Sequence, residues 1–316
     1  MSQFGVVAFV GRPNAGKSTL LNRVLGQKVS IVSAKPQTTR NRIVGILNDP
    51  RGQLAFLDTP GIHRPLHKLN VRMMDHVRSS LSEADVIALI VDATEPFGKG
   101  DQYVIDMLRE AGVVRASGAP FKGAPEARTT PDAKRFVILN KIDLLKKTKL
   151  LPLIEQYHGF GIFDEIVPIS ASKGEGTDEL VSLLFKTVAP GEAVYPKEDY
   201  TTQPERFFAA EIVREKVLQH TSEELPYTTA VSVDRFEEDE EKNLIKIYAT
   251  IFVERDSQKA IVIGKQGAMI KRIGTEARVE LESILGAKVF LDLHVSVHER
   301  WREDERFLGE LEWPLG

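Results

Sequence analysis

The sequence predicts two domains: an α/β domain with a mixed, mostly parallel sheet and helices on both faces, followed by a smaller α+β domain. Three observations support this prediction. Apolar runs of strand length alternate with helical periodicity from Phe4 to about Val188. A stretch rich in proline, glycine and charge then interrupts the periodicity, and a different pattern begins at Glu205. The length of 316 residues also fits two domains.

Strands and helices are expected to alternate along the first domain. The expected strands are 5–10, 43–47, 53–58, 86–92, 135–140 and 165–169, and the expected helices are 17–25, 70–81, 101–109, 152–157 and 177–187. Met74, Val77 and Leu81 fall on one stripe of their helix, which favours core packing over a methionine-lined ligand site.

Composition excludes several classes of protein. The chain has no cysteine, so it cannot form disulfides, use a thiol nucleophile or bind metal through cysteine, and this fits a cytoplasmic protein. Its amino terminus lacks the pattern of a signal peptide, and no apolar run reaches the length of a membrane span. The net charge of −3 divides into +4 before Glu205 and −7 from there on. Any binding of nucleic acid must therefore use a local basic patch.

A phosphate-binding loop is predicted between the first strand and the first helix. Its residues are Gly11, Arg12, Pro13, Asn14, Ala15, Gly16, Lys17, Ser18 and Thr19. Loop N–H groups and a helix N-terminus together attract an anion, so the order of strand, glycine-bounded loop and helix suits a nucleotide triphosphate. Lys17 would reach the outer phosphates, and the Ser18 hydroxyl would ligate Mg²⁺.

A second motif, Asp58-Thr59-Pro60-Gly61, stands where a strand ends, the edge at which open α/β sheets bind ligands. Asp58 can hold Mg²⁺ through water, and the Gly61 N–H can approach a γ-phosphate. The polar segment 33–42 lies between the two motifs and contains Thr38 and Thr39. It is either a solvated loop or a switch whose threonine hydroxyl joins the Mg²⁺ shell only while the γ-phosphate is present.

The run Asn140-Lys141-Ile142-Asp143 ends another strand and favours guanine as the base. The Asp143 carboxylate can accept hydrogen bonds from N1–H and the 2-amino group of guanine, whereas adenine has an acceptor and no amino group at those positions. Ser170 and Ala171, after the last strand, offer a backbone N–H to the guanine O6.

The second domain, from Glu205, reads as a helix, strands at 228–236 and 243–253 joined by an acidic turn, a helix pair and a strand at 289–297. A Gly-x-x-Gly turn precedes the second helix of the pair and lets backbone approach phosphates. Residues 255–278 hold six basic and two acidic side chains, which supply the local basic patch. The residues of this patch expected to contact a nucleic acid are Ile263, Gly264, Lys265, Gln266, Gly267, Lys271 and Arg272. We expect the amphipathic segment 301–313 to pack on this domain.

The motifs of the first domain resemble the five guanine-nucleotide boxes of translation-factor GTPases. The specific sequence Gly-Arg-Pro-Asn-Ala-Gly-Lys-Ser, followed by Gln-Thr-Thr-Arg, is similar to the corresponding motifs of the Era family. The Gly-x-x-Gly turn, with its flanking strands and helices, resembles a type II KH module, which clamps single-stranded RNA. On this resemblance the chain divides into a GTPase domain at 1–188, a linker at 189–204 and a KH domain with a C-terminal helix at 205–316. The stretch 115–134 is an insertion relative to the family pattern.

The resemblance implies a GTPase that uses Mg²⁺, binds the 3′ end of 16S ribosomal RNA and assists assembly of the small ribosomal subunit. Ile62 stands where Ras-like enzymes carry a glutamine that orients water, and the resemblance therefore implies slow GTP hydrolysis. Lys17 and Thr39 would be catalytic, as would Asn14, which in some relatives holds K⁺. The resemblance also implies peripheral association with the inner face of the cell membrane, although no amphipathic basic helix requires it. We expect a monomer.

Two other functions stay open at this point. One is an RNA-binding assembly scaffold with a vestigial nucleotide site, against which the intact Lys17, Ser18, Asp58 and Asp143 argue. The other is a different GTPase of the Era superfamily that acts on another RNA. A second nucleotide-binding half or a carboxy-terminal cysteine would favour that alternative, and the sequence has neither.

Overall fold

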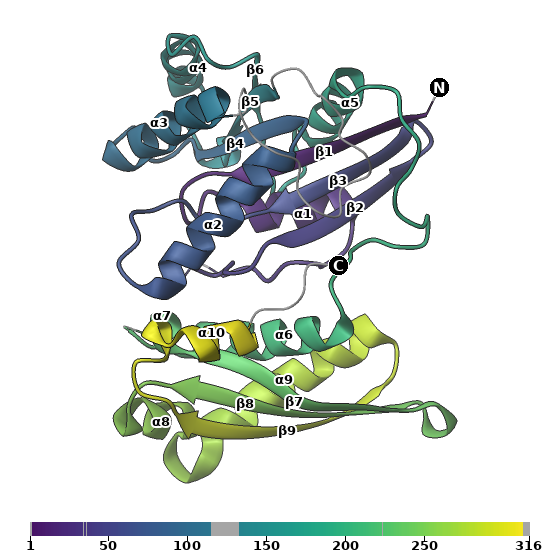
Figure 1. Cartoon of the computed structure of the whole chain (residues 1–316), viewed down its shortest axis with the longest axis vertical. Coiled ribbons are helices and arrows are strands. Elements are labelled where there is room, and N and C mark those ends of the chain that lie inside the picture. The colour runs from purple at the N-terminus through teal and green to yellow at the C-terminus, as the bar shows by residue number, and fades with distance from the viewer. Residues whose placement is uncertain (1, 34, 36, 115–132, 223, 312–316) are drawn as a thin grey trace. The chain divides into compact units, whose positions relative to one another are not determined.

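The computed structural model describes residues 2–33, 35, 37–114, 133–222 and 224–311 (Figure 1). Contacts divide the chain into two compact units. Unit 1 comprises Met1–Ser30, Thr39–Pro65 and Arg72–Thr202, and unit 2 comprises Ile31–Thr38, Leu66–Val71 and Gln203–Gly316. Two short segments of the N-terminal half therefore pack with the C-terminal half. Residues 115–132 of the predicted insertion lie outside the described residues.

Unit 1 is built on a sheet of order β2-β3-β1-β4-β5-β6. Its strands are β1 (Gln3–Val10), β2 (Ile43–Asp49), β3 (Gly52–Asp58), β4 (Val86–Asp92), β5 (Lys134–Asn140) and β6 (Glu165–Pro168). The β2–β3 pair is antiparallel and every other pair is parallel. This mixed, mostly parallel sheet confirms the predicted fold class of the first domain.

Helices cover both faces of this sheet (Figure 1). They are α1 (Lys17–Leu25), α2 (Lys68–Glu83), α3 (Lys99–Val114), α4 (Leu150–His158) and α5 (Thr177–Thr187), with short 3₁₀ turns at Ile142–Leu144 and Lys147–Lys149. One apolar cluster joins side chains of α2, α3 and α4 to one face of the strands. The predicted stripe Met74, Val77 and Leu81 is buried in this cluster, so its assignment to the core is confirmed.

The predicted linker is attached to unit 1 over most of its length. Pro190 and Thr201 form isolated bridges with Gln3 and Gly45. The Gln53 side chain accepts the N–H groups of Val194 and Tyr195 at 2.9 and 3.0 Å. Unit 1 accordingly extends to Thr202, and the change of unit falls at Gln203.

Unit 2 has a sheet of order β7-β8-β9, antiparallel between the first two strands and parallel between the last two. Its elements are α6 (Glu205–His220), α7 (Leu225–Thr228), β7 (Ala230–Asp239), β8 (Leu244–Val253), α8 (Asp256–Ile263), α9 (Ala268–Leu285), β9 (Lys288–Val297) and α10 (Glu305–Leu311), with 3₁₀ turns at Glu240–Lys242, Lys265–Gly267 and Trp301–Glu303. β7 reaches three residues beyond the predicted strand, so the acidic turn is shorter than expected. Trp301 is fully buried and donates from Nε1 to the Thr228 carbonyl at 2.8 Å, which fixes the C-terminal segment on this unit.

Candidate nucleotide site and candidate RNA-binding turn

The loop between β1 and α1 has the geometry of a phosphate cradle. Gly16 has φ +97°, and a Cβ there would lie 2.2 Å from Asn140 Nδ2, so a larger residue would collide with the neighbouring motif. Lys17 is buried and its Nζ donates to the carbonyls of Gly11 at 3.3 Å and Arg12 at 3.1 Å. Burial lowers the Lys17 pKa to about 8, against the opposing effect of Asp58. A buried ammonium group whose hydrogen bonds go to uncharged carbonyls is suited to binding a phosphate.

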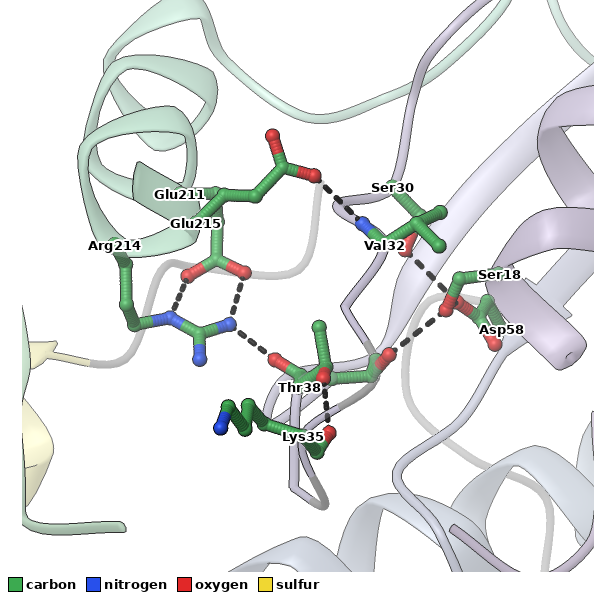
Figure 2. Close-up of polar contacts among 10 residues, drawn as sticks. Ser18, Ser30, Val32, Lys35, Thr38, Asp58, Glu211, Arg214 and Glu215 are labelled. Carbon is green, nitrogen blue, oxygen red and sulfur yellow. Dashed lines mark hydrogen bonds and ion pairs between the residues drawn. The ribbon is translucent and has the colours of Figure 1, made fainter. Parts of the chain in front are cut away.

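Three predicted Mg²⁺ ligands from separate segments meet beside the loop, and Figure 2 shows two of them, Ser18 and Asp58. Ser18 Oγ lies 2.6 Å from Asp58 Oδ2 and 2.9 Å from Thr39 Oγ1. Asp58 is completely buried, and its Oδ1 has no hydrogen-bond partner among the described residues. A buried carboxylate oxygen left without a partner is costly, and hydroxyl and carboxylate oxygens are the ligands that Mg²⁺ prefers. The three residues therefore fit the ion, completed by water and nucleotide phosphates.

Two residues that sequence reasoning missed hold Asp58 in place. Ser30 is buried and donates from Oγ to Asp58 Oδ2 at 3.0 Å. Asn22 in α1 accepts the N–H groups of Val29 and Ser30 and donates to the Ser30 carbonyl. Burial raises the Asp58 pKa, whereas Lys17 and the hydroxyls of Ser18 and Ser30 lower it. No local pattern identified Asn22 or Ser30, because their role depends on the path of segment 26–30 across α1.

The segment after Asp58 is anchored on the phosphate loop. Thr59 donates from Oγ1 to the Phe9 carbonyl at 2.7 Å, and the Ile62 N–H donates to the Gly11 carbonyl at 2.9 Å. A Cβ on Gly61 would lie 2.7 Å from the backbone nitrogen of Pro13, so the two motifs are in close backbone contact. The Ile62 side chain is buried in the apolar cluster of α2 and α3. It therefore offers no group that could orient water.

The predicted guanine motifs are joined by Asn140. Its Nδ2 donates to the Ala15 carbonyl at 2.9 Å, and its Oδ1 accepts the N–H groups of Lys141 and Ala171 at 2.8 and 2.9 Å. One buried amide thus connects the phosphate loop to both base-facing segments. Asp143 is exposed one turn beyond it, in the turn Ile142–Leu144. Lys141 is paired with Asp92 at 2.5 Å.

Arg23 is a further residue that the motifs did not predict. From the last turn of α1 its guanidinium donates to the carbonyls of Ala171 at 3.0 Å and Ser172 at 2.5 Å. These bonds hold the loop that contains Ser170 and Ala171. The only sequence signal was a basic residue in the last helical turn, a position common to many helices.

Arg12 and Asn14 are two further residues of the predicted phosphate loop. Arg12 forms an ion pair with Asp101 of α3 at 3.0 Å. Asn14 is exposed and has a left-handed backbone with φ +62°. Asn14 therefore stands at the rim of the loop, where a solvent-accessible cation can reach it.

The predicted RNA-binding turn lies between α8 and α9 of unit 2. Gly264 has φ +71°, and a Cβ there would lie 2.9 Å from the Met269 nitrogen, so the turn requires glycine. Lys265, Gln266 and Lys271 are exposed, whereas Arg272 is paired with Glu276 at 3.0 Å. The turn thus presents backbone and two lysine side chains at the start of α9. Neither unit has a described helix long and apolar enough to cross a membrane.

Family models match both parts of the chain. A 50S ribosome-binding GTPase family matches residues 6–117, and a KH domain family matches residues 224–302. The GTPase Era of Geobacter metallireducens is 48% identical over 307 residues, which are 97% of this chain and 96% of that protein. The GTPase Era of Syntrophus aciditrophicus is 44% identical over 310 residues, 98% of this chain and 95% of that protein.

Solved structures give the same result in three dimensions. A crystal structure of Era in complex with MgGDPNP and nucleotides 1506–1542 of 16S ribosomal RNA superposes with a TM-score of 0.89 and 40% identity, and covers 100% of both chains. An Aquifex aeolicus Era bound to GDP·AlF₄⁻ superposes with a TM-score of 0.88 and 39% identity, and covers 99% of this chain and 100% of that one. The GTPase and KH parts are therefore arranged along the chain as in those proteins.

Proposed function

Because the chain belongs to the Era family of GTPases, we propose that it is a slow GTP-hydrolysing switch that binds the 3′ end of 16S ribosomal RNA and assists assembly of the small ribosomal subunit. The observation that supports this most strongly is the cluster of Ser18, Thr39 and Asp58 oxygens beside Lys17. An Era crystallised with that RNA and a magnesium-bound GTP analogue supplies the RNA target. The proposal extends that target to this chain.

We assign the phosphate and metal roles as follows. Lys17 holds the outer phosphates as a point charge, and the loop N–H groups around it bind the remaining phosphate oxygens. Ser18 and Thr39 hold Mg²⁺ directly and Asp58 holds it through water, and the bound ion neutralises charge on the phosphates. Turnover is slow because Ile62 is buried and apolar, and so cannot orient the attacking water.

Two further assignments rest on position. Asp143 selects guanine, and the loop at Ala171, held by Asn140 and Arg23, borders the base, although the Ala171 N–H itself is donated to Asn140 Oδ1. Asn14 at the loop rim holds K⁺, which would place a positive charge near the phosphates. Hydrolysis measured in potassium chloride and in sodium chloride at equal ionic strength tests this. Equal rates would remove the potassium role.

The RNA is assigned to the turn between α8 and α9. Gly264 and Gly267 allow close approach of backbone to phosphates, and Lys265 and Lys271 add charge beside the N-terminus of the 18-residue helix α9. KH turns of this kind clamp about four nucleotides of single-stranded RNA. The acidic balance of unit 2 limits binding elsewhere to weak contacts.

The test combines nucleotide competition with RNA crosslinking. A fluorescent GTP analogue should be displaced by GTP and GDP but not by ATP, and Lys17→Ala should abolish its binding. Crosslinks to a 16S 3′-end RNA should change in yield or position between the GTP analogue and GDP. If nucleotide binding is absent while crosslinking persists, the protein is an RNA-binding scaffold. If guanine binding is intact but this RNA is not bound above a random RNA, the chain acts on another RNA.

A further inference from the structure

One face of α6 in unit 2 holds segment 31–38, which contains the first part of the predicted switch at 33–42. Glu215 accepts the Val32 N–H at 2.8 Å, and Arg214 donates from Nη2 to the Thr38 carbonyl (Figure 2). The Glu211 carboxylate accepts two hydrogen bonds from the Arg214 guanidinium, one from Nε at 2.7 Å and one from Nη2 at 2.6 Å, and so fixes its orientation. The segment is therefore held near both of its ends by side chains more than 170 residues away in sequence.

The charges that make these contacts are desolvated. Arg214 is 3% exposed, Glu215 is 1% exposed and Glu211 is 8% exposed. Charged side chains are rarely so buried unless each has a specific partner, because loss of hydration costs several kcal/mol per ion. Here the partners include two backbone groups of segment 31–38. The contact is thus directional, and it fixes backbone positions instead of filling space.

The held segment ends where the metal site begins. Thr38, whose carbonyl Arg214 binds, belongs to unit 2, and Thr39, whose Oγ1 lies 2.9 Å from Ser18 Oγ, belongs to unit 1. A single peptide bond joins the two, and a peptide bond is planar and stiff. Fixing the Thr38 carbonyl therefore restricts the position from which the Thr39 side chain leaves the backbone.

We propose that Arg214, oriented by Glu211, and Glu215 are positioning residues for Thr39, and that they act on it through the backbone of segment 31–38. The inference rests on the proposed function, because it takes Thr39 as a ligand used only with a triphosphate. It follows that loss of this support weakens binding of GTP and its analogues while binding of GDP is little changed. A general loss of stability would weaken both nucleotides alike.

The test uses the full chain and compares three variants. Arg214→Lys keeps a positive charge beside Glu211 but loses the planar fork that reaches both Glu211 and the Thr38 carbonyl. The double variant Glu211→Gln with Arg214→Gln removes both charges and so leaves neither buried without a partner. Arg206→Lys is the control, since Arg206 lies on the same helix, is exposed and donates instead to the Val233 carbonyl at 3.0 Å.

The measured quantities are the Kd of a non-hydrolysable GTP analogue and of GDP, each titrated with Mg²⁺, and the unfolding temperature. We expect the ratio of the two Kd values to shift about tenfold against the GTP analogue in both test variants. This shift corresponds to the free energy of about one hydrogen bond to a charged group. The control should keep the wild-type ratio. An unchanged ratio in Arg214→Lys overturns the inference, even if the double variant fails to fold. If the wild-type chain itself fails to bind guanine nucleotides, the proposed function fails instead.

Discussion

Removal of the Ser30 hydroxyl should weaken Mg²⁺ binding about 30-fold. Ser30 is 2% exposed and gives Asp58 Oδ2 one of the two hydroxyl hydrogen bonds it receives, the other coming from Ser18. A hydrogen bond to a charged group contributes about 1.5–3 kcal/mol, and about 2 kcal/mol corresponds to roughly 30-fold at 1.36 kcal/mol per decade. Partners that orient metal-binding groups typically alter metal affinity by about 10- to 100-fold, which agrees.

The assay titrates Mg²⁺ into Ser30→Ala in the presence of a fluorescent GTP analogue and compares the midpoint with wild type. Ser80→Ala is the matched control, because Ser80 is equally buried but donates to the His76 carbonyl within α2. Both variants lose one buried hydrogen bond and should lose similar stability, about 1 kcal/mol. The prediction is wrong if the Mg²⁺ midpoints of Ser30→Ala and Ser80→Ala shift equally from the wild-type value, or if Ser30→Ala keeps the wild-type midpoint.

Three more variants test the other parts of the site. Asp143→Asn should weaken GTP binding by about two orders of magnitude, because two charge-assisted hydrogen bonds are lost, and should favour xanthosine nucleotides, whose C2 carbonyl accepts from the new amide. Nucleotide competition measures this preference, and an unchanged preference for guanine contradicts the prediction. Arg23→Gln should weaken the binding of GTP and of GDP equally, about tenfold, because Arg23 holds the loop at Ala171 that is proposed to border the base. A loss of affinity confined to GTP would contradict that role. Gly264→Ala should abolish binding of the 16S 3′-end RNA and leave GTP hydrolysis unchanged. The control Gly286→Ala should bind this RNA normally, because Gly286 has a similar φ but open space around an added Cβ. If Gly264→Ala still binds the RNA, the assignment of the turn is wrong.

Much of the fold was predictable because local signals agree with one another. Helices 17–25 and 177–187 and strand 86–92 have the predicted bounds, since glycine caps or a continuous apolar run mark their ends. α3 runs from Lys99 to Val114, longer at both ends than the predicted 101–109. The prediction of a linker at 189–204 followed composition, which does not reveal the hydrogen bonds from Val194 and Tyr195 to Gln53, because these form only when the chain is folded.

The site was predictable only where a motif fixes backbone and side chain together. Lys17, Ser18 and Asp58 lie at the junctions of strand, loop and helix, so their meeting follows from the topology of a parallel sheet. Asn22 and Arg23 lie in the last turn of α1, and there the sequence indicates the face of a helix but not what covers it. Their partners, Ser30 and the loop at Ala171, approach from segments whose path no periodicity describes.

The charged face of α6 shows this limit most clearly. Glu211, Arg214 and Glu215 follow a spacing of three and four residues, a pattern typical of a solvated helix surface, yet all three are buried. Stability alone does not account for charges there, because apolar residues of similar volume are often neutral or stabilising in place of a buried ion pair. The three side chains do bond two backbone groups of segment 31–38, since Glu215 accepts the Val32 N–H and Arg214, fixed by Glu211, donates to the Thr38 carbonyl. The face is therefore better explained by segment 31–38, which it holds, than by the helix it belongs to.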